Sequence, residues 1–359
     1  MSPVPAISVT LPVFNAEAYI GEAVESILGQ TLADFELIII NDGSSDRSGP
    51  ILQELAARDP RINLIERPNG GLVSALNDAI ALARGDFIAR MDADDIAMPE
   101  RLALQYARMT SEPGLGVLGS FIRIVDHAGR TIRMADYPVT VEEVAKFIEL
   151  GSPVAHPSVM IRRDVLRATG AYRQVFRHCE DYDLWLRITE LGYGIANLPV
   201  PLLNYRVHGN NVSSVHREAQ ETATLVARAA HRSRKLGFGD PTSGMTALSH
   251  RSLAAFPAQI REHFEPELFA LKYASISLAG RDALLSAWRD YEALAERTRR
   301  HPSMTGFLMR IARGSFENAS PRLLIHAVLS AMRYHPKLAL GMIFGKARRL
   351  FGVMRPKSH

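Results

Sequence analysis

Residues 35–46 read FELIIINDGSSD, and this stretch decides the fold. Residues 35–40 form a nearly continuous apolar run, which is typical of a strand buried on both faces of a parallel sheet. Residues 41–46 follow as a polar turn that ends the strand. Such a strand indicates an α/β protein, and the segments on either side of it agree.

Strand and helix patterns alternate through the first 110 residues or so. We predict strands at Ile7–Val13, 35–40, 62–65 and 86–91, and helices at 17–30, Ser48–Arg58 and 72–84. This order predicts a mainly parallel sheet with helices on both faces. Ligands of such sheets bind beyond the carboxyl ends of the strands. Three unusual loops lie at those ends: residues 14–16, 41–46 and 92–95.

The pattern changes after about residue 115. A hairpin is predicted over 117–134 with its turn at 127–130, then a strand at 156–162, a helix at 181–191 and an extended stretch at 195–207. From about Glu218 the chain reads as mostly helical, and residues 237–244 read as a linker. We therefore predict two domains, residues 1–217 and 218–359.

Composition excludes several classes of protein. The 359 residues are 47% hydrophobic and 22% charged, an ordinary globular balance. Cys179 is the single cysteine, so neither an internal disulfide nor a cysteine-based zinc site is expected, and a reducing compartment is predicted. Neither a signal peptide nor a bilayer-spanning segment is recognisable.

Positive charge is concentrated at the end of the sequence. Residues 321–359 carry eight Lys or Arg and no Asp or Glu, so the net charge of +4 leaves −4 for the other 320 residues. The pI of 9.2 therefore belongs to this basic tail, and we expect no nucleic-acid partner. Basic and apolar residues without acids are typical of an interfacial helix, so the tail is predicted to bind an anionic membrane surface. The alternative is a helical pair packed on the body.

Three carboxylates crowd into the sequence RMDADDIAMPERL, residues 90–102: Asp92, Asp94 and Asp95. One interpretation is the start of a helix, since Pro99 and Glu100 suit a first helical turn. The other is a divalent cation, because Mg²⁺ and similar hard cations take carboxylate oxygens together with substrate phosphates. The triplet alone does not decide between them.

Six motifs in order, PVFNAEAYI, ELIIINDGSSD, NGGLVSALNDAIALARGDFIARMDADD, HPSVMIRR, EDYDLWLRI and YRVHGNNVS, resemble a bacterial family-two glycosyltransferase of the GT-A fold. The resemblance covers roughly residues 5 to 215. It implies a mixed, mainly parallel sheet flanked by helices, followed here by a helical C-terminal region. It also implies a nucleotide-diphosphate sugar donor, most simply a UDP-sugar, and a Mn²⁺ or Mg²⁺ cofactor.

The resemblance implies roles for particular residues. Asp42 resembles the residue that contacts the base, although an Asx-turn would also explain it. Leu76 stands where many relatives carry Arg, so a phosphate contact is absent there or supplied elsewhere. Other positions that resemble donor-contacting ones are Pro12, Phe14, Asn15, Glu17, Asn69, Gly70, Asn77, Asp92 (facing the ribose) and His156 (lining the donor-sugar pocket).

The resemblance also implies metal-binding and catalytic roles for four further residues. Asp94 resembles the metal ligand and His208 the histidine that completes the metal shell, whereas Asp95 is predicted to cap the following helix. Glu180 and Asp181 resemble the family's acidic pair, in which the Asp is the general base. An acidic first turn of a helix explains the same pair, and both interpretations can hold together. Asp183 is a third candidate base, and Trp185 is assigned to the core.

The predicted activity is therefore an inverting glycosyl transfer to a saccharide or lipid-linked acceptor in cell-surface polysaccharide or glycolipid synthesis. The predicted location is cytoplasmic, peripheral on the inner face of the plasma membrane. Two alternatives are a nucleotidyltransferase and a non-catalytic membrane-associated scaffold on the same fold. The first normally needs a Gly-rich phosphate loop with Lys or Arg after the first strand, and PVFNAEAYI has none.

Overall fold

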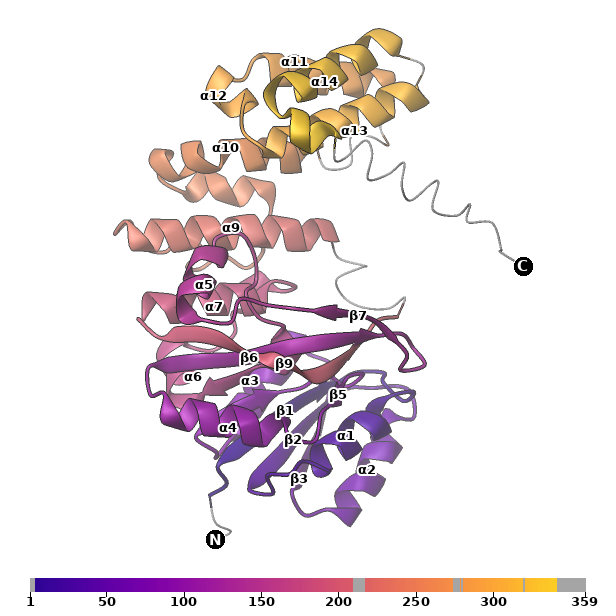
Figure 1. The fold of residues 1–359 in the computed structure, drawn as a ribbon, viewed down its shortest axis with the longest axis vertical. Helices are drawn as coiled ribbons and strands as arrows, with labels where there is room; N and C mark the ends of the chain where they lie inside the picture. The colour runs from indigo at the N-terminus through magenta and orange to yellow at the C-terminus, as the bar shows by residue number, and fades with distance from the viewer. Residues whose placement is uncertain (1–3, 209–216, 274–277, 279, 319, 341–359) are drawn as a thin grey trace, which may run out of the picture. The chain divides into compact units, whose positions relative to one another are not determined.

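A computed structural model describes residues 4–208, 217–273, 278, 280–318 and 320–340 (Figure 1). The chain divides into two compact units, Met1–Leu248 and Ser249–His359. Each unit has its own apolar core. Among the described residues, no helix has the length and apolar character needed to span a bilayer.

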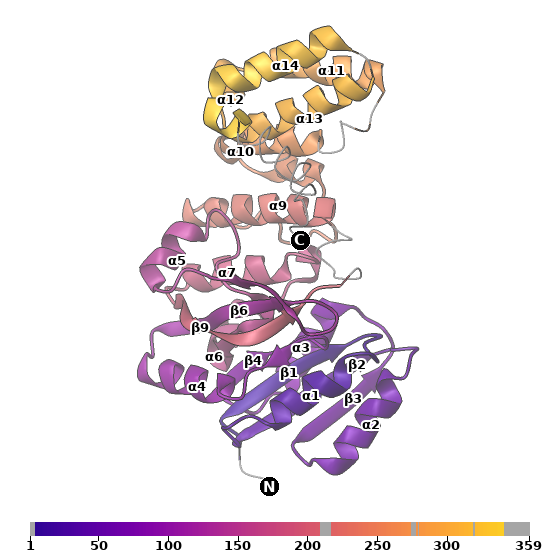
Figure 2. The ribbon, with the colours of Figure 1, turned by 45° about the vertical axis from the view of Figure 1, so that its right-hand side comes forward.

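Four parallel strands form the first half of the first unit: β1 (Ile7–Val13), β2 (Phe35–Asp42), β3 (Ile62–Arg67) and β4 (Phe87–Arg90), in the order β3-β2-β1-β4. Every residue of β2 is buried, as its apolar run predicts. The connections are the helices α1 (Ile20–Leu28), α2 (Ser48–Arg58) and α3 (Leu72–Leu82). Figure 2 shows α1 and α2 in front of these strands and α3 behind them, as right-handed crossovers require. The predicted α/β pattern is confirmed.

The second half completes a mixed sheet, with the strand order β3-β2-β1-β4-β8-β6-β9-β5. Its strands are β5 (Ile96–Ala97), β6 (Leu115–Val125), β7 (Thr131–Ala135), β8 (Met160–Arg162) and β9 (Gly194–Arg206). β8 runs antiparallel to β4 and to β6, β9 runs parallel to β6, and β7 pairs with β6 as the predicted hairpin. The predicted class, a mixed sheet flanked by helices, is confirmed.

Four helices complete this half: α4 (Arg101–Ser111), α5 (Val141–Phe147), α6 (Arg163–Thr169) and α7 (Glu180–Glu190). The strand predicted over 156–162 is wrong in its first half, because His156–Ser158 forms a 3-10 turn. Pro157 explains the difference, since proline has no N–H to donate to a sheet.

Helix α9 (Arg217–Lys235) packs against α7 and belongs to the first unit. The unit division therefore falls after Leu248, later than the change of pattern at residue 218. Residues 237–244, predicted as a linker, fold back on the first unit, because Asp240 accepts bonds from Arg173 and Arg234.

The second unit is helical, as predicted for this region. It contains α10 (Ala258–Lys272), α11 (Arg281–Glu292), α12 (Glu296–Arg299), α13 (Ser303–Glu317) and α14 (Pro321–Tyr334). The described part of the basic tail is residues 321–340, and its helix α14 packs on α13 through Leu323, Ala327 and Ala331. Tail residues 341–359 lie outside the described residues.

Candidate active site

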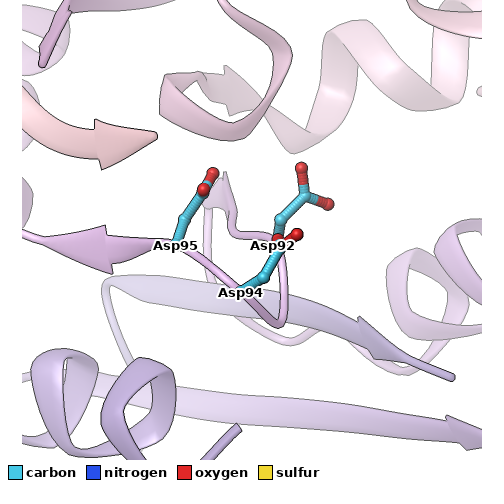
Figure 3. Close-up of side chains that lie close together, drawn as sticks. All are labelled: Asp92, Asp94 and Asp95. Carbon is cyan, nitrogen blue, oxygen red and sulfur yellow. The ribbon is translucent and has the colours of Figure 1, made fainter. Parts of the chain in front are cut away.

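The aspartate triplet occupies the turn between β4 and β5, beyond the carboxyl end of a central strand (Figure 3). Asp92, Asp94 and Asp95 project toward the same side of this turn, and one carboxylate oxygen of each lies within 4.8 Å of the others. Sheets of this type bind ligands at this edge, and the triplet lies there as its place after the strand predicted.

Two buried arginines hold the turn. Arg90, the last residue of β4, makes two bonds to the Asp92 carboxylate, of 2.5 and 2.6 Å. Arg206, the last residue of β9, donates its backbone N–H to Asp95 Oδ1 at 2.9 Å and its Nε–H to the backbone oxygen of Asp94 at 2.9 Å. The triplet is thereby fixed between strands that lie far apart in the sequence.

His208 follows Arg206 by two residues and reaches the same turn. Its Nε2 lies 2.9 Å from Asp94 Oδ2. Its ring stacks on Tyr19, with 5.4 Å between ring centres and 20° between ring planes. The two residues assigned to the metal therefore lie in direct contact.

The donor set of this turn fits a divalent cation. Burial raises the pKa of Asp92, with a further rise from the charge of Asp94, and burial raises the pKa of Asp95 well above its usual range. Among the described residues, Asp95 Oδ2 is buried without a hydrogen-bond partner. Clustered carboxylates with an unused buried oxygen are stabilised by a cation, and the nearby imidazole favours manganese among the hard-cation choices.

Asp95 does not cap the following helix, so that prediction is wrong. The next element is β5, and α4 begins only at Arg101. The Asp95 carboxylate instead accepts the Arg206 N–H, because the β5–β9 pairing brings the two chain segments together.

The acidic pair lies in the first turn of α7, so the helix-start interpretation also holds. Glu180 is buried; this burial, followed by the charge of Asp181, raises its pKa to about 7. Burial likewise raises the pKa of Asp181. The Asp181 charge contributes to the raised pKa of Asp92, so the acidic pair and the triplet border the same site.

Asp183 is not available as a base. Its carboxylate is fully buried and is bound by Arg173 and by Arg187, the latter at 2.9 Å. Arg187 also donates to the backbone oxygens of Thr169 and Ala171. This network ties α7 to the loop that leads into Tyr172.

Tyr172 is a site residue that the sequence analysis missed. Its hydroxyl lies 2.8 Å from His156 Nε2, and its phenol has a pKa raised by burial and then by the charges of Asp181, Glu180 and Asp92. Its only sequence signal is the preceding Gly-Ala, where both residues adopt positive φ and turn the chain into the site. Burial, followed by the Arg90 charge, lowers the pKa of His156 well below its usual range, so this imidazole is neutral.

The predicted donor pocket brings the loops after β1 and β2 together. Asn15 Oδ1 accepts the Ser45 N–H at 2.8 Å, and Glu17 Oε2 accepts the Arg47 N–H at 2.9 Å. Phe14 is 54% exposed beside them, whereas Pro12 is buried within β1 opposite Ile40. These contacts build a wall from residues 14–17 and 44–47.

Asp42, at the end of β2, organises the loop before α3. Its carboxylate accepts bonds from Arg67 Nε at 2.7 Å and from the N–H groups of Gly70 and Gly71 at 2.9 and 2.8 Å. Asn69 donates to the backbone oxygen of Asp42 at 2.8 Å. One cluster at the sheet edge therefore contains Asp42, Asn69 and Gly70. Asp42 stabilises this loop in the absence of a donor, and its contact with a donor stays a prediction.

Asn77 does not join the cluster around Asp42. The Asn77 side-chain amide makes two hydrogen bonds to the backbone of Tyr172. Its oxygen accepts the Tyr172 N–H at 3.1 Å, and its nitrogen donates to the Tyr172 backbone oxygen at 2.8 Å. Asn77 therefore positions Tyr172, and contact with a donor stays a prediction.

Comparison with known proteins finds relatives of this chain. The family model "Glycosyl transferase family 2" matches residues 8–170. The O-antigen biosynthesis glycosyltransferase WbnJ of Escherichia coli is 36% identical over 208 residues, 57% of this chain and 81% of that protein. The chain belongs to glycosyl transferase family 2. The matched residues include β1 from its second residue onward, the triplet turn and His156, and they end before α7.

Two solved structures resemble this glycosyltransferase in fold. S. aureus TarS residues 1–349, in complex with UDP-GlcNAc, gives a TM-score of 0.52 at 17% identity and covers 91% of each chain. The mannosyltransferase PcManGT of Pyrobaculum calidifontis, in complex with GDP-Man and Mn²⁺, gives a TM-score of 0.50 at 18% identity, covering 92% of this chain and 88% of that one.

Proposed function

We propose that this chain is an inverting, metal-dependent glycosyltransferase that takes a sugar from a nucleotide diphosphate, most simply UDP, and acts in the synthesis of a cell-surface polysaccharide or glycolipid. The observation that carries the proposal is the contact between His208 and Asp94 at a triplet that borders Asp181. The names of the relative WbnJ and of the neighbours bound to UDP-GlcNAc and to GDP-Man with Mn²⁺ support it.

The donor would lie across the carboxyl edge of the sheet. The wall of residues 14–17 and the Asp42 cluster would hold the nucleoside, and Asp92 would face the ribose while Arg90 keeps it oriented. Asp94 and His208 would hold Mn²⁺ or Mg²⁺, which offsets the negative charge that develops on the departing diphosphate. Neutral His156 and Tyr172 would border the sugar without adding charge.

Asp181 is the proposed general base. It takes the proton of an acceptor hydroxyl while that oxygen attacks the anomeric carbon, and the bond from this carbon to the diphosphate oxygen breaks as the diphosphate leaves with the electron pair. A single displacement turns an α-linked donor into a β-linked product. The raised pKa of Asp181 suits a group that accepts a proton during the reaction.

The test is transfer by the full chain, with Mn²⁺, from a panel of nucleotide sugars to saccharide and lipid-linked acceptors. Proton NMR of the product reports the anomeric configuration. A β-linked product formed only with metal supports the proposal, and an α-linked product from an α-linked donor overturns inversion. Absence of both transfer and donor hydrolysis across the panel favours the non-catalytic scaffold. Release of pyrophosphate with nucleotide attached to the acceptor favours the nucleotidyltransferase.

A further inference from the structure

Charge is divided between the two compact units. Residues 249–359 contain 18 Lys and Arg against 8 Asp and Glu, a net charge of +10. The total of +4 leaves −6 for residues 1–248, the unit with the triplet and the acidic pair. A strongly basic helical unit in a chain whose other unit is acidic indicates an anionic partner for the helical unit.

Helix α14 presents one apolar and basic stripe to solvent. Arg322, Ile325, Leu329 and Arg333 follow one another at spacings of three, four and four, so they share a face of the helix. All four are exposed, Ile325 at 54% and Leu329 at 61%. The opposite face packs on α13, and the two helices lie side by side in Figures 1 and 2.

The residues around this stripe favour an anionic lipid surface over a protein as its partner. No Asp or Glu follows Glu317 in the sequence, so no acidic side chain of this segment interrupts the stripe. Two aliphatic side chains between two guanidinium groups match the boundary between acyl chains and anionic headgroups, where arginines stay at the surface while aliphatic groups enter the membrane. A protein partner would need acids to pair with these arginines and an apolar surface between them.

We propose that the exposed face of α14 docks on an anionic lipid surface and brings the catalytic unit to membrane-bound acceptors. Ile325 and Leu329 enter the interface, while Arg322 and Arg333 contact anionic headgroups. Because exposed charges are screened within about 8 Å at physiological salt, docking weakens as ionic strength rises.

Sedimentation of the full chain with vesicles tests this. Vesicles of phosphatidylcholine with phosphatidylglycerol should carry the protein down, and vesicles of phosphatidylcholine alone should not. Ile325→Ser with Leu329→Ser, and separately Arg322→Gln with Arg333→Gln, should each weaken sedimentation at least about tenfold. A matched control is Leu82→Ser with Leu104→Ser, two side chains of the first unit exposed at 45% and 44%, which should sediment like the original chain.

Three results would overturn the proposal. The first is unchanged sedimentation of both stripe variants. The second is loss of binding on changing Lys346, Arg348 and Arg349 to Gln while both stripe variants still bind. The third is self-association of the original chain in solution that the stripe variants abolish, without vesicle binding, which would make the stripe a contact between copies. Thermal unfolding of each variant checks that it is folded.

Discussion

His208 Nε2 lies 2.9 Å from Asp94 Oδ2, although the two residues are 114 positions apart in the sequence. Arg206 produces this contact, since its side chain binds the backbone of Asp94 and its N–H binds Asp95. Strand β9 thus ends against the turn that follows β4, and the imidazole arrives where the carboxylates gather. A histidine placed in this way is suited to share a cation with Asp94.

Removing either member of this contact should abolish metal-assisted binding of the nucleotide. For Asp94→Ala and for His208→Ala we expect the affinity for UDP in the presence of Mn²⁺ to fall more than about tenfold, because each change removes a ligand atom. Isothermal calorimetry with and without Mn²⁺ measures it. Asp34→Ala, an exposed carboxylate outside the site, is the control. If UDP binding depends on Mn²⁺ to the same degree in all three variants, residues other than Asp94 and His208 hold the metal.

Stability should depend on pH through Glu180. Its pKa is raised to about 7 from an ordinary value of 4.5, mainly by burial, so between these values the folded chain holds a proton that the unfolded chain has lost. Stability therefore falls as pH rises through this window. Glu180→Gln removes the titration, so thermal unfolding at about pH 5 and about pH 8 should show the original chain losing more stability than the variant. The exposed Glu142→Gln variant should behave like the original chain. Equal losses in the original chain and Glu180→Gln would contradict a raised pKa.

Local patterns predict the first half of the fold well. The predicted bounds of Ile7–Val13 and Ser48–Arg58 match β1 and α2, because a buried parallel strand and an amphipathic helix are each recognisable over about ten residues. His156 shows the limit of such patterns: its apolar neighbours suggested a strand, and the Pro157 ring favoured a 3-10 turn.

Motifs predict the residues of the candidate site, and packing adds contacts that the motifs do not predict. Asp94, His208 and Asp181 stand in recognisable motifs. Tyr172 lies outside the motifs, and Arg206 lies in one that gave it no role, because the role of Arg206 arises from a contact with a segment distant in sequence. Arg90 also lies in a motif, and only the folded chain shows that it binds Asp92. The assignment of Asp95 as a helix cap was wrong because its partner is distant in sequence. Only the folded chain shows that the Asp95 carboxylate accepts the Arg206 N–H.

The buried network beneath the acidic pair should be necessary for stability. Asp183→Asn leaves Arg173 and Arg187 without their shared carboxylate, and breaking a buried ion pair costs about 3 to 5 kcal/mol. Urea unfolding measures the loss. Asp164→Asn, the same change at an exposed position on α6, should cost less than about 1 kcal/mol. Similar losses in both variants would show that the network contributes little.

The assignment of the base makes the sharpest prediction. Direct displacement requires the acceptor hydroxyl to lose its proton as it attacks, and a positioned base contributes about 10²- to 10⁴-fold to the rate. Asp181→Asn keeps the shape of the side chain and removes its ability to take the proton. We therefore expect kcat to fall by that factor while the affinity for the nucleotide sugar and the unfolding temperature stay unchanged.

Glu180→Gln separates the two members of the pair. Glu180 is buried, and within the described part of the chain its Oε2 has no hydrogen-bond partner, whereas Asp181 is only partly buried. An acceptor hydroxyl therefore reaches Asp181 more readily, and Glu180→Gln should reduce kcat less than Asp181→Asn does. If Asp181→Asn keeps near-normal kcat while Glu180→Gln loses it, Glu180 is the base. If neither change lowers kcat, the displacement does not use this pair. The Asn and Gln side chains of the variants cannot accept the proton, so a required base at either position would lower kcat when replaced.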